Sequence, residues 1–166
     1  GDFVARDRAL AKDFGAAAAA CSVGRIVYLS GLHPDNTPLS DHLASRVEVG
    51  EILMDSGVPT AVLQAAVIIG SGSASFEMLR HLTQRLPVMV APKWLENRIQ
   101  PIAIRDVLHY LIGAASLDST VNRTFDIGGP DVITYRQMIT TYAVEAGIRR
   151  PWIQTVPVLT PRLASH

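Results

Sequence analysis

The stretch Thr60-Ala-Val-Leu-Gln-Ala-Ala-Val-Ile-Ile69 is apolar at all but two of its positions. Pro59 precedes it and Gly70-Ser-Gly72 follows it, so turn-forming residues bound the apolar run on both sides. A short continuous apolar run is typical of a strand buried on both faces of a parallel sheet. Residues 76–86 follow with helical periodicity. The strand–turn–helix order predicts one unit of an α/β fold.

The same alternation extends in both directions along the chain. Ser40 predicts the start of a helix that ends at Gly57, and Thr134 with Gln137 matches a capping box. Asp106 is expected to cap a helix that buries Val107, Leu108, Leu111 and Ile112. Helices are expected at 3–20, 40–57, 106–115 and 134–145, and strands at 25–30, 88–90, 99–104 and 124–127. Strands that alternate with helices in this way predict a mostly parallel sheet.

Composition narrows the functional classes. The 166 residues carry 15 Lys and Arg against 15 Asp and Glu, and 48% are apolar. This balance excludes a disordered chain and argues against nucleic-acid binding. Cys21 is the only cysteine, which excludes an intrachain disulfide and suits a reducing compartment. With no long apolar run and no signal peptide, we expect a cytoplasmic protein of one domain without a membrane partner.

The segment Gly70-Ser-Gly-Ser-Ala-Ser75 lies between a predicted strand and a predicted helix. It approximates the glycine-rich turn that places a phosphate at a helix N-terminus. Ser75 replaces the third glycine of that pattern, and no acidic residue ends the next strand. The alternative is an ordinary strand-to-helix turn, in which Gly and Ser are common.

His42 and Arg46 lie one turn apart on a predicted helix and therefore share one face. Histidine transfers protons near neutral pH, while arginine holds oxyanions or hydroxyl groups. The alternative is a solvated first turn without a function. Ser30 ends a predicted strand but does not form the Gly-x-Ser-x-Gly nucleophile turn.

The other polar candidates point to no further site. His33, His81, His109 and His166 show no paired spacing for a metal, so no metal is expected. His81 and His109 are interpreted as surface residues of helices. Cys21 is interpreted as a small buried residue.

Four phrases occur in order along the chain: Arg25-Ile-Val-Tyr-Leu-Ser-Gly31, Val58-Pro-Thr-Ala-Val-Leu-Gln-Ala-Ala-Val-Ile-Ile-Gly70, Gln100-Pro-Ile-Ala-Ile-Arg-Asp-Val-Leu108 and Thr124-Phe-Asp-Ile-Gly-Gly-Pro-Asp-Val-Ile-Thr-Tyr-Arg-Gln-Met138. Together they resemble the extended and atypical short-chain dehydrogenase/reductases, often described as NAD-dependent epimerase-like or NmrA-like. The resemblance covers essentially the whole chain.

The resemblance implies a fold in which residues 1–166 form the C-terminal portion of a Rossmann-like, doubly wound parallel sheet. The family's Gly-x-x-Gly-x-x-Gly turn has no counterpart here, so the nucleotide-binding half is expected to be missing. Residues 1–166 would form a single incomplete NAD(P)-binding domain, with 129–166 as a partial substrate-side segment. The turn at 70–75 would then lie in the nicotinamide and substrate region.

The resemblance also implies a substituted catalytic set. The family's Tyr-x-x-x-Lys spacing falls on His42 and Arg46, and its active-site Ser or Thr falls on Gly31, with Ser30 adjacent. All three family groups are therefore replaced. His42 would donate a proton, and Arg46 would hold the nicotinamide ribose.

NAD or NADP is implied as the cofactor of the complete protein, with weak or no binding by these residues alone. Besides Arg46, the residues implied to contact it are Leu29, Ala65, Ala66, Val67 and Ile68. The substrate side is implied at Gly70, Ser71, Gly72, Phe76, Arg98 and Gln100. Nearby apolar residues suggest either a hydrophobic ligand or a core stripe; they are Met78, Leu82, Met89 and Trp94.

Three functional hypotheses follow. The first is an NAD(P)-dependent oxidoreductase or epimerase that acts on a small carbonyl compound. The second is a non-catalytic NAD(P)-binding sensor or scaffold, suggested by the substituted catalytic set. The third is a self-standing fold that uses Gly70-Ser-Gly72 for phosphate. We also expect an exposed apolar face where the missing half-sheet would pack, and hence self-association.

Overall fold

A computed structural model describes residues 2–33, 38–85 and 88–156 of the chain. The chain forms two compact units. Unit 1 contains Gly1–Ala66 and Ile104–Gly128, and unit 2 contains Val67–Ala103 and Gly129–His166.

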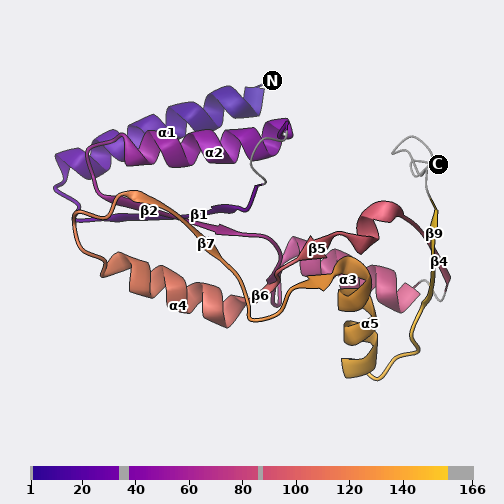
Figure 1. The fold of residues 1–166 in the computed structure, drawn as a ribbon. Helices are drawn as coiled ribbons and strands as arrows, with labels where there is room; N and C mark the ends of the chain where they lie inside the picture. The colour runs from indigo at the N-terminus through magenta and orange to yellow at the C-terminus, as the bar shows by residue number, and fades with distance from the viewer. Residues whose placement is uncertain (1, 34–37, 86–87, 157–166) are drawn as a thin grey trace. The chain divides into compact units, whose positions relative to one another are not determined.

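Unit 1 is built on a parallel sheet of three strands, β1 (Ile26–Gly31), β2 (Thr60–Ala65) and β7 (Arg123–Ile127), in the order β1-β2-β7 (Figure 1). Every residue of β2, the central strand, is buried. The expectation of an α/β fold with a parallel sheet is confirmed for this unit.

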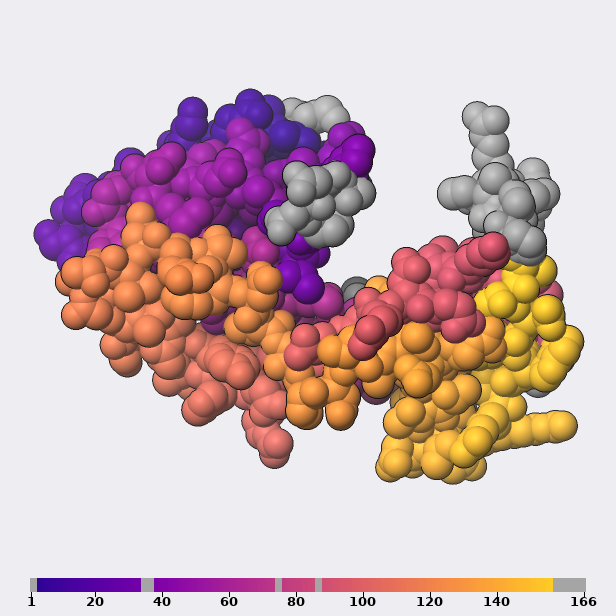
Figure 2. Space-filling model, viewed as in Figure 1, coloured from indigo at the N-terminus to yellow at the C-terminus, as the bar shows by residue number. Residues whose placement is uncertain are grey.

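Helices cover both faces of this sheet. Helices α1 (Asp2–Ala20) and α2 (Asp41–Met54) lie on one face, and α4 (Ile104–Ala115) lies on the other (Figure 1). In Figure 2 the same arrangement places the salmon-to-orange segment 104–128 on one side of unit 1 and the indigo-to-purple helices on the opposite side. Ala18, Ile26, Leu53 and Val58 form a buried apolar cluster between the helices and the sheet.

Local signals set the ends of α2 as predicted. The side chain of Ser40 accepts a hydrogen bond from the amide of Leu43 and so caps the helix N-terminus. Gly57 follows the helix with a φ of +85°, a left-handed conformation that glycine adopts without steric cost.

Unit 2 contains short paired strands and two helices around its own core. Strands β3 and β6 pair in parallel, β4 and β9 pair in parallel, and β5 and β8 pair in antiparallel. The buried core consists of Val67, Leu79, Met89, Ala91, Leu95, Met138 and Ile139. The elements are β3 (Ile68–Ile69), α3 (Ala74–Arg85), β4 (Val88–Pro92), the 3-10 helix η1 (Lys93–Glu96), β5 (Arg98–Ile99), β6 (Ile102–Ala103), β8 (Ile133–Thr134), α5 (Tyr135–Glu145) and β9 (Trp152–Val156).

Two predicted strands are each divided in the structure. The run 60–69 breaks at the exposed residue Ala66, so β2 belongs to unit 1 and β3 to unit 2. The run 99–104 breaks at Pro101, which has no amide hydrogen to donate to a strand ladder. The carbonyl of Pro101 instead accepts a hydrogen bond from the amide of Gly129 at 2.9 Å.

The prediction for α4 was partly wrong. The helix begins at Ile104, so Asp106 lies inside its first turn and is not the cap. Val107 is fully buried as expected, but Leu108 is 52% exposed and Ile112 is 72% exposed. The apolar face of α4 is therefore wider than the surface that unit 1 covers.

Cys21 also departs from its expected burial. It follows the last residue of α1, where its amide donates to the carbonyl of Ala17 at 3.0 Å. Because the chain turns away from the core at this point, the thiol is exposed.

Candidate functional site

The carboxyl ends of the three parallel strands bring polar side chains into one row. Ser30 of β1 lies beside Gln64 of β2, and Gln64 lies beside Asp126 of β7. Ser30 and Gln64 are each 7% exposed. In open α/β sheets, ligands bind beyond the carboxyl ends of the strands. This row is therefore the candidate site of unit 1.

The hydroxyl of Ser30 has an unusual environment. Its oxygen is buried and has no hydrogen-bond partner among the residues that the structure describes. A buried polar group without a partner costs about 1–3 kcal/mol. A ligand atom that bonded to this hydroxyl would recover that free energy.

Gly31 brings the end of β1 against the first turn of α2. A Cβ atom at Gly31 would lie 3.0 Å from the Cδ1 atom of Leu43, a close contact that a small shift of this flexible side chain would relieve. Leu43 directly follows His42 in α2. Leu43 therefore brings the first turn of α2 close to the end of β1, while the neighbouring side chain of His42 is exposed.

His42 and Arg46 are both exposed on α2. The imidazole of His42 lies beside the ring of Phe3 from α1, with the two ring centres 6.2 Å apart and the planes tilted by 46°. Within the described residues, no hydrogen bond joins Ser30, His42 and Arg46.

Helix α1 holds α2 in place beside the sheet. The buried hydroxyl of Ser45 donates to the carboxylate of Asp7 at 2.9 Å. Arg8 donates to Glu48 at 2.5 Å, and this hydrogen bond, with the attraction between the charges, raises the pKa of Arg8. These contacts fix the helix that carries His42 and Arg46.

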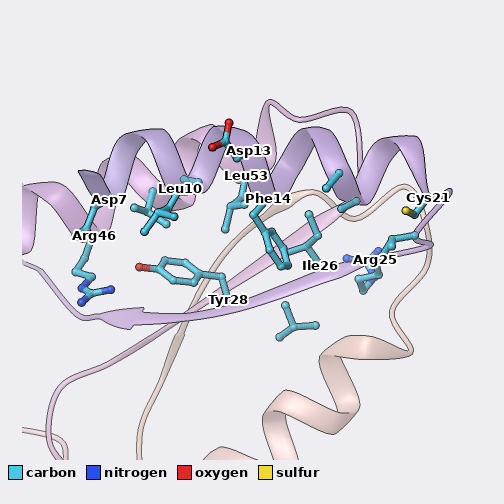
Figure 3. A pocket seen from close by; sticks show the side chains of 16 residues that line it. Asp7, Leu10, Asp13, Phe14, Cys21, Arg25, Ile26, Tyr28, Arg46 and Leu53 are labelled. Atoms are coloured by element: carbon cyan, nitrogen blue, oxygen red, sulfur yellow. The ribbon is translucent and has the colours of Figure 1, made fainter. Parts of the chain in front are cut away.

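A cavity of about 850 Å³, here called the α1–β1 hollow, lies between α1, α2 and β1 (Figure 3). Phe14 and Leu10 extend from α1 over the hollow, and Arg46 lies at one end. The hydroxyl of Tyr28 points toward the Arg46 end, is buried, and has no partner among the described residues. Tyr28 was not among the predicted site residues, because its only signal in the sequence is a phenol within a short apolar run.

A second cavity of about 600 Å³ lies beside β2 and β7. Its lining includes the site residues Gln64 and Asp126 together with Glu51, His33 and Arg123. His33 was considered only as a metal ligand from the sequence. Its place beside the carboxyl ends of β2 and β7 makes it a further polar group of the candidate site.

The predicted cofactor residues are divided between the units. Leu29 and Ala65 lie near the ends of β1 and β2 in unit 1, and Ala66 is the exposed residue that follows β2. Val67 is buried in the core of unit 2, and Ile68 lies in β3.

The predicted substrate residues all lie in unit 2, and several already have structural contacts. The amide of Ser73 donates to the carbonyl of Gly70, while the hydroxyl of Ser73 donates to the carbonyl of Ile68. Gly72 has a φ of +82°, as an ordinary tight turn requires, and Ser71 is exposed on it. Because the turn uses its own polar groups in this way, it offers fewer free amides for phosphate.

The remaining substrate candidates have similar structural contacts. Phe76 packs edge-to-face on Tyr142, with ring centres 5.8 Å apart. Gln100 donates to the carbonyl of Gly129 at 2.6 Å. Arg98 is exposed in β5, where it pairs with Thr134 of β8.

Two further findings concern metals and membranes. Among residues 2–33, 38–85 and 88–156, no group of three or more His, Cys, Asp or Glu side chains is placed to hold a metal ion. Over the same described ranges, no helix combines the length and apolar character needed to cross a bilayer.

No protein-family model matches this sequence, and none of the curated proteins is a recognisable relative. Solved structures do share its fold. A UDP-N-acetylglucosamine 4-epimerase from Bacillus cereus matches 96% of this chain and 63% of its own, with a TM-score of 0.73 and 16% identity. A dTDP-4-dehydrorhamnose reductase from Bacillus anthracis, in complex with NADP, matches 94% of this chain and 58% of its own, with a TM-score of 0.71 and 13% identity.

The enzyme WbmH from Bordetella bronchiseptica, in complex with NAD+, matches 93% of this chain and 58% of its own, with a TM-score of 0.70 and 16% identity. At these identities the similarity shows the fold alone. The chain thus has the α/β fold of these three structures, and it spans 58–63% of their lengths.

Proposed function

We propose that this chain is part of an NAD(P)-dependent oxidoreductase or epimerase of the extended or atypical short-chain dehydrogenase/reductase type, acting on a small carbonyl compound. The observation that carries the proposal is the buried hydroxyl of Ser30 at the carboxyl end of a parallel strand, which has no hydrogen-bond partner in the described part of the chain. It lies in a fold shared with structures that hold NAD+ or NADP.

We further propose that residues 1–166 are the C-terminal portion of a longer Rossmann-like sheet. Within the described residues β1 pairs with β2 alone, so its other edge is free to accept a further strand. The exposed thiol of Cys21 supports a cytoplasmic location, because a reducing compartment keeps such a thiol free.

The residues of unit 1 suit this chemistry. The nicotinamide cofactor supplies or accepts the hydride when it is bound. The hydroxyl of Ser30 donates a hydrogen bond to the substrate carbonyl, and His42 transfers a proton, since an imidazole ring can both donate and accept one. Arg46 holds ribose hydroxyl groups through its guanidinium group. Gly31 leaves room at the strand end, and Leu29, Ala65 and Ala66 border the cofactor through their backbone.

Turnover by the full-length protein tests this proposal. NADH and NADPH oxidation are followed across a panel of aldehydes, ketones and quinones, and nucleotide binding is measured separately. We expect the substitution His42→Ala to lower kcat by about 10²- to 10⁴-fold. His109→Ala, at another exposed histidine of unit 1, is the matched control and should leave kcat unchanged. Equal activity of wild type and His42→Ala would remove His42 from the mechanism.

A non-catalytic NAD(P)-binding sensor is the second candidate function. It is favoured by the replacement of the family's Tyr and Lys by His42 and Arg46. Both residues are exposed, and among the described residues neither forms a hydrogen bond with Ser30. A sensor would bind NAD(P) without consuming it on any member of the panel. Robust turnover would exclude this alternative.

A further inference from the structure

Unit 2 contains an apolar cleft of about 520 Å³ between α3, β4, η1 and α5, here called the α3 cleft. Small-molecule sites usually have volumes of about 300–1,000 Å³ and a mostly apolar lining. Leu79, Met89 and Ile139, each at most 6% exposed, line it from the core. Its size and lining are those of a ligand site.

Large apolar side chains at the cleft remain exposed. Met78 is 59% exposed, Leu82 is 41% exposed and Trp94 is 49% exposed. Met78 and Leu82 lie one turn apart and so share one face of α3. The indole of Trp94 meets the ring of Tyr135 edge-to-face, with ring centres 5.3 Å apart, which fixes both aromatic groups. These side chains form an apolar rim around the cleft.

Among the described residues, the lining of the cleft contains no charged side chain, and its side-chain polar atoms are those of Trp94 and Tyr135. Two arginines on the flanking elements are paired, Arg80 with Glu77 at 2.7 Å and Arg136 with Glu96 at 2.6 Å. Arg85 of α3, Lys93 of η1 and Glu145 of α5 lie on the same elements but do not line the cleft. A phosphate group buried against the described lining would lose hydration without gaining an ionic partner there, which is strongly unfavourable.

Methionine is concentrated at this cleft. The chain has four methionines, and Met78, Met89 and Met138 line the cleft. The methionine side chain is unbranched, flexible and polarisable, so surfaces rich in it adapt to apolar ligands of different shape.

We propose that the α3 cleft binds a neutral hydrocarbon group, such as an acyl or isoprenoid chain. This proposal concerns binding by unit 2 alone and goes beyond the proposed function. It distinguishes this chain from fold relatives whose structures hold UDP-glucose or UDP-glucuronic acid.

Binding is tested on the full-length protein with the neutral fluorescent probe N-phenyl-1-naphthylamine. We expect 1-decanol to displace the probe and UDP-glucose to leave it bound. Met78→Glu and Leu82→Glu should each weaken probe binding at least about tenfold, because each places a charge at the rim. Val144→Glu is the matched control, since Val144 is 47% exposed on α5 and does not line the cleft. Displacement by UDP-glucose, or equal loss in the control, would overturn the proposal.

A second measurement avoids variants that risk misfolding. In residues 1–166 carrying Trp152→Phe, Trp94 is the only tryptophan, and its emission should shift to shorter wavelength when 1-decanol binds. In residues 1–166 carrying Trp94→Phe, Trp152 is the only tryptophan; it does not line the cleft, and its emission should not move. The same shift in both proteins, or in neither, would contradict the assignment. Because neither assay contains NAD(P), a failure of the proposed catalytic function leaves both results interpretable.

Discussion

At the residue scale, Gly129 joins two distant parts of unit 2. A Cβ atom added to Gly129 would lie 2.4 Å from the carbonyl oxygen of Pro101, which is backbone and cannot swing away. The amide of Gly129 donates to that same oxygen. We therefore expect Gly129→Ala to lower the free energy of unfolding by about 2–3 kcal/mol, measured by urea denaturation.

Gly113 provides the matched control for this change. Nothing lies within 4 Å of a Cβ atom placed at Gly113, which lies inside α4. Gly113→Ala should raise the free energy of unfolding by about 0.5–1 kcal/mol, because alanine is the better helix former. If the two substitutions had the same effect, the close approach at Pro101 would not be the reason for glycine at position 129.

Substitution of two buried serines of unit 1 distinguishes a side chain that contributes to stability from one proposed to contribute to function. Ser45 is hydrogen-bonded to Asp7, whereas Ser30 has no partner within the described residues. Ser45→Ala should lower the free energy of unfolding by about 1–2 kcal/mol. Ser30→Ala should leave the free energy of unfolding unchanged or raise it by about 1 kcal/mol or less. In the full-length protein we expect Ser30→Ala to lower turnover. Marked destabilisation by Ser30→Ala, measured by urea denaturation, would show that its hydroxyl serves folding.

At the scale of the elements, the caps of α5 and α2 differ in strength. Thr134 accepts from the amide of Gln137 at 3.1 Å, and the side chain of Gln137 accepts in return from the amide of Thr134 at 2.7 Å. Ser40 makes a single longer contact with the amide of Leu43, at 3.4 Å. We expect Thr134→Ala to lower the free energy of unfolding by about 1–2 kcal/mol and Ser40→Ala to lower it by about 0.5 kcal/mol, measured by thermal or urea unfolding. Equal losses would contradict the reciprocal cap of α5.

Local chemistry is why these helix ends were predictable. Thr134 and Gln137 are three residues apart, and Gly57 takes a positive φ just beyond α2, as the sequence indicated; Gly147 does the same just beyond α5. Such signals act within a few residues, so a sequence displays them directly.

The strand breaks depend on distant contacts and were not predictable in the same way. Residues 60–69 look like one strand because every local position is suitable for a strand. The division arises because β2 pairs with β1 and β7, whereas β3 pairs with β6. The candidate site shows the same limit. Sequence spacing placed His42 and Arg46 on one helix face, but the burial of the Tyr28 hydroxyl, which points toward the Arg46 end of the hollow, depends on how α1 and α2 cover β1.

At the scale of the whole molecule, the helices on both sides of the unit 1 sheet expose apolar side chains. Phe14 of α1 is 59% exposed beside the α1–β1 hollow, and Ile112 of α4 is 72% exposed on the opposite face. Between them, β1 has one edge without a strand partner in the described residues. A free strand edge flanked by apolar side chains is a template for pairing with another chain.

We therefore expect residues 1–166 to associate with a second copy through β1 and the α1–β1 hollow. Light scattering or sedimentation over a tenfold range of concentration should show a mass that rises with concentration. Phe14→Lys should weaken this association by about tenfold, because it places a charge where the second copy packs, and should change the free energy of unfolding by less than about 0.5 kcal/mol. Val144→Lys, at an exposed apolar position of unit 2, should leave the association unchanged. A monodisperse monomer at every concentration would show that the free edge of β1 is protected in solution. If association were insensitive to Phe14→Lys, the contact would lie on another surface. The exposed face of α4 around Ile112 would then be the next surface to test.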